Sequence, residues 1–312
     1  MPLLRSLLAS ALLLSLGACA ATMSPRSQAI PEGSAAATSP PAASPEGVTP
    51  PASVGGAQAN DNVNTVAWMQ TSVEYRLIAG ETWRAALAQL DRAIKAPGWD
   101  ALAREDRTVP ATGLPPAVIV DIDETVLDNL PFQARLLRDN VDFHEEDFAR
   151  WIDERAARPV PGALEFARAA NARGVTIYYI SNRKQSYAEA TLANLRAAGF
   201  PVASDEQFMG AGFVVPGCTT TGSDKGCRRQ LVARTHRVLL QVGDQLGDMV
   251  SIASNNAAGR EAAVRPYLSW VGERWFVLPN PAYGSWESSL FGNDWTQPAA
   301  TRRQHKLDAL RY

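Results

Sequence analysis

Aspartate residues stand directly after two short apolar runs of this sequence. Asp121 and Asp123 follow the first run, and Asp244 and Asp248 follow the second. Asp244 and Asp248 share one face if a helix begins there. A single aspartate in such a place most often caps a helix, but four carboxylates gathered together repel one another unless a cation lies among them. Because oxygen ligands with few histidines or cysteines nearby favour Mg²⁺, the four residues predict a magnesium site.

Polar side chains stand at two further places in the sequence. Ser181, Asn182 and Arg183 follow a third apolar run, and Lys225 lies where a helix is expected to begin and to continue to about Arg234. A lysine at a helix N-terminus opposes the helix macrodipole, and local violations of this kind are typical of functional sites. A bound phosphate would account for the lysine, because helix N-termini and lysine both bind anions. The alternative is a solvated lysine in a loop.

The apolar runs themselves indicate the elements that position these side chains. Residues 117–120, 175–180 and 238–242 are rich in β-branched or aromatic residues, and helical patterns at 163–172 and 188–198 separate them. Strands that alternate with helices predict an α/β fold with an open parallel sheet and helices on both faces. Ligands bind outside the carboxyl ends of the strands in such a sheet. The polar groups that follow the three strands are therefore expected to converge on one crevice.

Other segments surround this expected sheet. A further strand is expected at 275–278, and apolar residues at helical spacing predict one or two helices over 63–94. The stretch at about 128–160 is helical in pattern and carries several aromatic residues, so we expect it to form a small helical cap. Asp128 and Asn129, at the start of this stretch, either line the site or belong to a polar helix surface.

The beginning of the chain indicates export and lipid anchoring. Residues 7–16 form an apolar run after a positive start, too short to span a bilayer, which is typical of a signal peptide. The stretch 16–19 resembles a bacterial lipobox, so we expect a lipoprotein signal peptide over 1–18 and lipid on Cys19. An ordinary signal peptide is the alternative. Ala20 in place of aspartate favours the outer membrane, with the protein facing the periplasm or the surface.

The amino-acid composition distinguishes a tether from a folded domain and argues against some classes of partner. Residues 19–60 are mostly Ala, Ser, Pro, Thr and Gly and predict a disordered tether, which leaves 61–312 as the folded domain. A net charge of -2 without a basic stripe argues against a nucleic-acid partner. In an oxidising compartment Cys218 and Cys227 are either joined in a disulfide or present as two free thiols. With only three histidines, the chain offers little for a zinc site.

The motifs match, in order, the signatures of a known enzyme family. Asp-Ile-Asp-Glu-Thr at 121–125 is similar to Asp-x-Asp-x-Thr, the first signature of haloacid-dehalogenase-type (HAD) phosphatases. Ser181 fits the second signature, Lys225 the third and the stretch 243–248 the fourth. More narrowly, from about residue 65 to the C-terminus the chain resembles class C bacterial acid phosphatases of the outer-membrane lipoprotein type. The stretches that carry the narrower resemblance are 121–129, 158–163, 181–184 and 278–284.

The resemblance implies a magnesium-dependent mechanism with a covalent intermediate. Asp121 would attack phosphorus and become an aspartyl-phosphate, while Asp123 would protonate the leaving alcohol and then activate water. Mg²⁺ would be held by Asp121, the backbone carbonyl of Asp123 and Asp244, and Asp248 would orient a metal-bound water. The residues expected to bind the phosphoryl oxygens are Ser181, Asn182 and Lys225. Serine stands at 181 where threonine is common, and either hydroxyl can bind phosphate.

The resemblance also bears on the substrate and on partners. Phe148 and Tyr283 fall where the family places two rings around a nucleobase or nicotinamide, which implies 5'-nucleotides or nicotinamide mononucleotide as substrates. The alternative is that these aromatic side chains pack in the hydrophobic core and do not contact a substrate. A phosphatase of the same fold for sugar or other small phosphates is the first alternative function, and a non-catalytic surface lipoprotein is the second. Family members often form homodimers, but no interface can be read from the sequence.

Overall fold

The computed structural model describes residues 60–219 and 222–312 of the chain. The predicted signal peptide, Cys19 and nearly all of the predicted tether lie outside the described residues. Among the helices of the described part, none is long and apolar enough to cross a bilayer.

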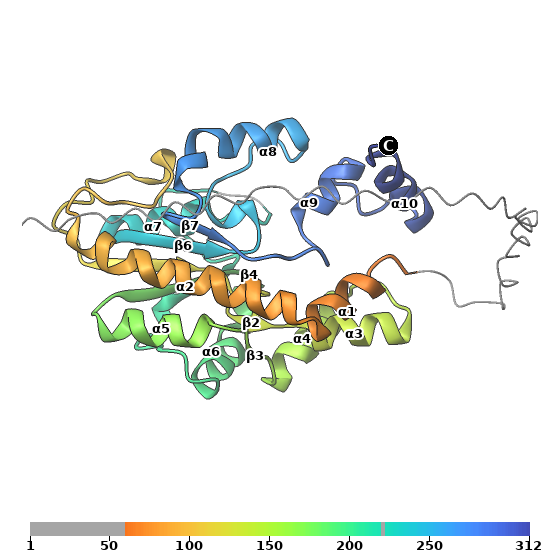
Figure 1. Cartoon of the computed structure of the whole chain (residues 1–312), viewed down its shortest axis with the longest axis horizontal. Coiled ribbons are helices and arrows are strands. Elements are labelled where there is room, and N and C mark those ends of the chain that lie inside the picture. The colour runs from red at the N-terminus through yellow and green to blue at the C-terminus, as the bar shows by residue number, and fades with distance from the viewer. Residues whose placement is uncertain (1–59, 220–221) are drawn as a thin grey trace, which may run out of the picture. The chain divides into compact units, whose positions relative to one another are not determined.

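Five parallel strands form the central sheet, in the order β5-β4-β1-β6-β7 (Figure 1). Their bounds are Pro116–Val120 for β1, Thr176–Lys184 for β4, Phe208–Ala211 for β5, Arg237–Gly243 for β6 and Trp275–Val277 for β7. The chain builds one side of the sheet from β1 through β4 to β5, and then returns to place β6 on the other side of β1. Ligand crevices form at the carboxyl ends of strands where the order reverses in this way.

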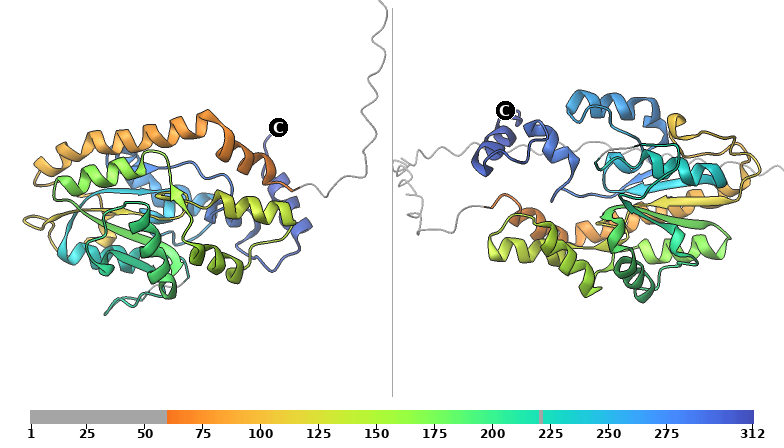
Figure 2. Two further views of the ribbon diagram at one scale, coloured as in Figure 1. Left: turned by 90° about the horizontal axis from the view of Figure 1, so that it is seen from below. Right: turned by 180° about the vertical axis from the view of Figure 1, so that it is seen from behind.

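Helices cover both faces of the sheet, so the predicted fold class is confirmed (Figures 1 and 2). The helices of one face are α2 (Val73–Lys95), α5 (Ala163–Ala172) and α6 (Ala188–Ala197), and those of the other are α7 (Gly226–Thr235) and α8 (Ala257–Val264). Side chains of a strand point alternately to the two faces. In β1, Val118 and Val120 join the core under the first group of helices, whereas Ala117 and Ile119 join the core under the second.

The predicted helical region at 63–94 consists of two helices, α1 (Val63–Thr71) and α2. Ser72 separates them, because its backbone is extended and its side chain accepts a hydrogen bond from the Tyr75 amide at 3.1 Å. This is the usual role of serine as an N-cap. The helix α1 packs against α3 (Leu130–Asp139), and α2 lies along α5 and β6.

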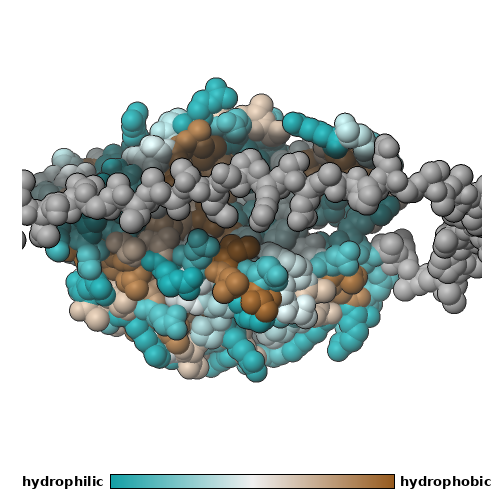
Figure 3. Space-filling view, viewed as in Figure 1, coloured by the Kyte–Doolittle hydropathy of each residue, from teal (hydrophilic) through white to brown (hydrophobic). Residues whose placement is uncertain are grey.

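The segment expected to form a cap contains the helices α3 and α4 (Glu145–Glu154). Two short antiparallel strands, β2 (Leu127–Asp128) and β3 (Arg158–Pro159), join it to the core. The chain ends with α9 (Ser285–Ser288) and α10 (Ala299–Asp308). The face seen in Figure 3 is mainly hydrophilic, with hydrophobic residues in separate patches, as is ordinary for a protein surface.

Candidate active site

A buried lysine and two buried aspartates meet at the carboxyl end of the sheet. Asp121 directly follows β1, and its amide still donates to the Val242 carbonyl of β6 at 3.0 Å. The Lys225 ammonium lies 2.5 Å from Asp121 Oδ1 and 2.8 Å from Asp248 Oδ1. Lys225 is the residue that precedes α7, so the predicted helix begins where its sequence indicated. The lysine faces carboxylates, which offsets its unfavourable place at a helix N-terminus.

Burial and mutual charge govern the ionisation of these groups. Burial, with further contributions from Asp248 and Asp244, raises the pKa of Asp121 well above its ordinary value despite the opposing charge of Lys225. Burial alone would lower the pKa of Lys225, but the charges of Asp121 and Asp248 outweigh it and the pKa is raised. The site therefore keeps the lysine charged, and makes a cation favourable beside the aspartates.

Asp244, directly after β6, is held by two amide side chains. Gln245 Nε2 and Asn280 Nδ2 both donate to Asp244 Oδ2, each at 2.8 Å. Burial, and next the charge of Asp248, raise the pKa of Asp244 to about 6. The two amides fix Oδ2, whereas Oδ1 accepts only a longer hydrogen bond from the Thr125 hydroxyl, at 3.4 Å, and is the oxygen more open to a cation.

The carboxylate set fits a divalent metal ion. Asp121, Asp244 and Asp248 each offer an oxygen, and these oxygens all lie within 4.8 Å of one another. One lysine does not balance three carboxylates, and a set of oxygen donors alone suits a hard cation such as Mg²⁺. Only glycine fits at 243, because a Cβ there would lie 2.1 Å from Asp248 Oδ2. The turn that carries Asp248 is a short 3₁₀ helix (Leu246–Asp248), and it brings the two aspartates together as the expected helical turn would.

Asp123 turns away from this carboxylate set. Its Oδ1 accepts from Arg183 Nε at 2.9 Å and from Asn129 Nδ2 at 2.6 Å, and its Oδ2 accepts from the Ser181 hydroxyl at 3.2 Å. Within the described residues, the side chain of Asp123 is not part of the group that could hold a metal. This position of the carboxylate is compatible with the expectation that Asp123 contacts a metal only through its backbone carbonyl.

The chain turns sharply between Asp123 and the cap. Glu124 has a φ of 53°, in the left-handed region that non-glycine residues rarely adopt. Its buried Oε1 accepts from the amide of Asn129 at 2.8 Å. Burial, and next the charges of Asp123 and Asp244, raise the pKa of Glu124 well above its ordinary value. This turn leads the chain from Asp123 towards β2 and the cap, and the bond from Asn129 to Glu124 holds it.

The other two residues expected to bind phosphate differ in exposure. Ser181 is buried and Asn182 is exposed. Arg228, a buried residue in the first turn of α7, bonds to both: its Nη1 lies 2.5 Å from the Ser181 carbonyl oxygen, and its Nη2 lies 3.1 Å from Asn182 Oδ1. Burial lowers the pKa of Arg228 to about 10. This arginine ties the end of β4 to the helix that follows Lys225.

A family model describes most of the chain. The model of HAD superfamily, subfamily IIIB (acid phosphatase), matches residues 50–286. The chain belongs to this family. The solved structure of a class C acid phosphatase from Bacillus anthracis is similar, with a TM-score of 0.69 and 29% identity, over 80% of this chain and 97% of that one. Another structure of the Bacillus anthracis enzyme, with tungstate bound, gives a TM-score of 0.68 and 28% identity over the same shares.

Two curated plant proteins are similar over a shorter region. They are acid phosphatase 1 of Solanum lycopersicum and the stem 31 kDa glycoprotein of Glycine max, each 25% identical over 165 residues, or 53% of this chain. The matches cover 57% and 58% of those proteins, so the chain spans somewhat more than half the length of these relatives.

The two rings expected to hold a substrate base belong to different clusters. Phe148 in α4 packs against Phe132 and Phe143, with ring centroids 5.3 and 5.7 Å away, and the Arg183 guanidinium lies 5.7 Å from its centroid. Tyr283 packs instead beside a cluster formed by α1, the start of α2 and the cap. Both rings are half-buried.

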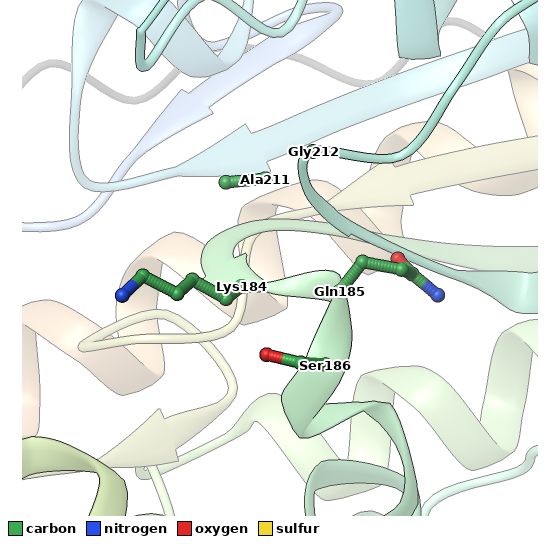
Figure 4. A pocket seen from close by; sticks show the side chains of 5 residues that line it. All are labelled: Lys184, Gln185, Ser186, Ala211 and Gly212. Atoms are coloured by element: carbon green, nitrogen blue, oxygen red, sulfur yellow. The ribbon is translucent and has the colours of Figure 1, made fainter.

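A cavity of about 480 Å³ opens at the ends of β4 and β5 (Figure 4). Its lining residues are Lys184, Gln185, Ser186, Ala211 and Gly212. In Figure 4, Lys184 and Ser186 extend to the same side, whereas Gln185 turns away from them. One of the lining residues, Lys184, also contacts the cap, because its Nζ lies 3.3 Å from Glu145 Oε1 at the start of α4.

The two cysteines form a disulfide nine residues apart in sequence. Cys227 is the second residue of α7, two positions after Lys225. The bond therefore ties the loop that precedes Lys225 to the helix that follows it.

Four side chains make contacts in this site that were not predicted from the sequence. They are those of Arg183, Arg228, Gln245 and Asn280. A signal for Asn280 was present, because it lies shortly after the predicted strand at 275–278, where a polar residue faces the same sheet edge. Arg183 and Arg228 bond to groups distant in sequence, and no local pattern indicates such contacts.

Proposed function

We propose that this protein is a Mg²⁺-dependent acid phosphatase that hydrolyses phosphate monoesters through an aspartyl-phosphate on Asp121. The observation that carries the proposal is the meeting of Asp121, Lys225, Asp244 and Asp248 in one buried group. Asp123 stands beside this group and is bonded to other partners. A nucleophile, charge neutralisation and a separate proton donor are what phosphoryl transfer through a covalent intermediate requires.

Asp121 supplies the nucleophile. Lys225 bonds to its Oδ1, which leaves the second oxygen of the carboxylate to attack phosphorus. Burial removes water that would otherwise solvate and weaken this nucleophile. When bound by Asp121, Asp244 and Asp248, Mg²⁺ would neutralise charge on the phosphoryl oxygens. The charge of Lys225 acts in the same direction on an incoming phosphate.

Asp123 supplies the proton transfer. In the first step it protonates the leaving alcohol, and in the second it takes a proton from the water that attacks the aspartyl-phosphate. The Ser181 hydroxyl donates to Asp123 Oδ2 at 3.2 Å, which supports a role for this serine beside the proposed general acid. Asn182 and Lys225 complete the expected set of phosphate ligands.

Nucleoside 5'-monophosphates and nicotinamide mononucleotide are the substrates that we propose for this site. The support is the resemblance of the stretches around Phe148 and Tyr283 to the family's base-binding rings. In the structure the two half-buried rings pack against different neighbours. Phe148→Ala and Tyr283→Ala should each reduce kcat/KM for a nucleotide more than for a small aryl phosphate; unchanged selectivity contradicts the assignment.

We also propose that Cys19 carries lipid and anchors the enzyme to a membrane. Ala20, in place of aspartate, favours the outer membrane as the site of the anchor. Incorporation of radioactive palmitate into the wild-type chain, and its loss in Cys19→Ser, tests the anchor. Sedimentation of the purified soluble domain tests the homodimer that the resemblance implies.

A panel of monophosphates tests the activity itself. Release of phosphate from nucleotides, sugar phosphates and an aryl phosphate is measured at acidic pH, with Mg²⁺ or with a chelator. The proposal expects hydrolysis that the chelator abolishes and that Mg²⁺ restores. Preference for sugar phosphates would favour the alternative phosphatase of this fold. Absence of hydrolysis under every condition would favour a non-catalytic surface lipoprotein.

A further inference from the structure

We propose that Trp151 and Asn129 are positioning residues through which the cap helix α4 orients the carboxylate of Asp123. The inference rests on the proposed function, because it assigns Asp123 the role of proton donor. It concerns three buried side chains that link the cap to the core: Trp151 in α4, Asn129 before α3 and Arg183 at the end of β4.

The orientation of the Asn129 amide follows from its partners. Its Oδ1 lies 2.7 Å from Trp151 Nε1 and 3.1 Å from Arg183 Nη2. An indole N–H and a guanidinium can only donate, so the oxygen of the amide must face them. The NH₂ group must then face Asp123, whose Oδ1 it meets at 2.6 Å. Trp151 and Arg183 therefore together determine which end of the amide Asp123 meets, and the bond from Trp151 is the shorter of the two.

The two oxygens of Asp123 consequently have different surroundings. Oδ1 accepts from Asn129 Nδ2, and Arg183 approaches it with Nε at 2.9 Å and Nη2 at 2.8 Å. All of these groups are donors, so a proton on Oδ1 would face other protons. Oδ2 meets the hydroxyl of Ser181, which can both donate and accept. The oxygen that carries the transferable proton is therefore Oδ2.

This asymmetry matters in the first chemical step. The bond from phosphorus to the leaving oxygen breaks as the bond from Asp121 to phosphorus forms, and the proton on Asp123 Oδ2 passes to the leaving oxygen. A carboxylate that rotates would present Oδ1, or would lose its alignment with that oxygen. Misplacement of a catalytic group by about 1 Å can reduce a rate about 100-fold.

Contacts within the cap and with the core hold the Trp151 ring in place. The guanidinium of Arg135 in α3 lies 5.1 Å from the centre of its ring, and the same arginine pairs with Glu154 in α4. Trp151 is almost fully buried in the main core. A movement of α4 would therefore reach Asp123 through one hydrogen bond to Asn129.

Trp151→Phe tests the inference, because it keeps the aromatic packing and removes the indole donor. Trp83→Phe is the matched control: Trp83 is also buried in the main core, but within the described residues its Nε1 has no hydrogen-bond partner. The readout is kcat/KM for an alkyl phosphate, whose leaving group needs protonation, and for p-nitrophenyl phosphate, whose leaving group needs little. We expect Trp151→Phe to lower the first value about 10- to 100-fold and the second by no more than about threefold, with Trp83→Phe near wild type on both.

Asn129→Asp provides a second variant of almost the same shape. It keeps acceptors for Trp151 and Arg183 but has no donor for Asp123, so it should show the same selective loss. Equal losses on both esters, or no loss in either variant when circular dichroism shows both folded, overturn the inference while the proposed function stands. A wild-type enzyme that hydrolyses neither ester contradicts the proposed function, and with it this inference.

Discussion

The metal-free protein should become less stable as pH rises from about 4 to about 6. Burial, and next the charge of Asp248, raise the pKa of Asp244 from its ordinary 3.8 to about 6 in the folded chain. Between these values the folded protein binds more protons than the unfolded chain, so a rise in pH favours unfolding. At about 1.4 kcal/mol for each tenfold change in proton affinity, Asp244 alone contributes a loss of about 3 kcal/mol by pH 7.

Mg²⁺ should reverse this loss. A cation that binds only the folded protein stabilises it by mass action, by about 3 kcal/mol at a concentration 100 times its dissociation constant. Near pH 4 the raised pKa values keep Asp121 and Asp244 protonated, so the same concentration of Mg²⁺ should add little. The ionised form of Asp244 therefore destabilises the metal-free protein, but it is also the form that binds Mg²⁺.

Urea unfolding followed by tryptophan fluorescence measures both effects. The free energy of unfolding is determined near pH 4 and near pH 7, in chelator and in Mg²⁺, for the wild type and for Asp244→Asn. The variant cannot ionise at 244, so the difference between the two proteins reports Asp244 together with its effect on the neighbouring Asp121 and Glu124. The wild type in chelator should lose about 3 kcal/mol more than the variant. An equal loss in the two proteins, or no effect of Mg²⁺ near pH 7, would refute the reasoning.

Three further outcomes follow from individual contacts. Asn280→Ala removes a 2.8 Å amide donor from Asp244 and should weaken Mg²⁺ binding about 10- to 100-fold by calorimetry; unchanged affinity would show that the amide does not orient the ligand. Asp106→Ala leaves the fully buried Arg229 without its carboxylate and should lower the free energy of unfolding by about 3 to 5 kcal/mol, whereas a loss below about 1 kcal/mol would mean that water replaces the partner. Replacing both members of the disulfide by serine opens a loop closed over a separation of nine residues and should cost about 2 to 3 kcal/mol in urea unfolding; no change would indicate that the loop stays ordered without the bond.

The sequence predicted the sheet and the meeting of the aspartates for one physical reason. Parallel strands have their carboxyl ends at the same edge, so polar residues after Val120 and Gly243 had to come together once the strands were recognised. The strand β5 was missed. It has four residues, one of them Gly210, and such a segment carries too little periodic pattern to distinguish it from a loop.

The parts that escaped prediction depend on tertiary contacts. The bond from Arg183 to the carboxylate of Asp123 was not predicted, nor was the left-handed turn at Glu124 that follows Asp123. No local pattern reveals that turn, because glutamate seldom adopts it. Asn280 bonds to Asp244, 36 residues away in sequence; its place after the predicted strand at 275–278 indicates the sheet edge but not this particular partner.

The most direct test of the proposed mechanism is acid quenching during turnover of a ³²P-labelled monoester. The proposal predicts that label appears on the wild-type protein in a bond that hydroxylamine cleaves, as expected of an acyl phosphate. It predicts neither label nor hydrolysis in Asp121→Asn, whose amide cannot act as the nucleophile. Label on the Asp121→Asn protein, or hydrolysis that persists in it, would contradict Asp121 as the residue that attacks phosphorus.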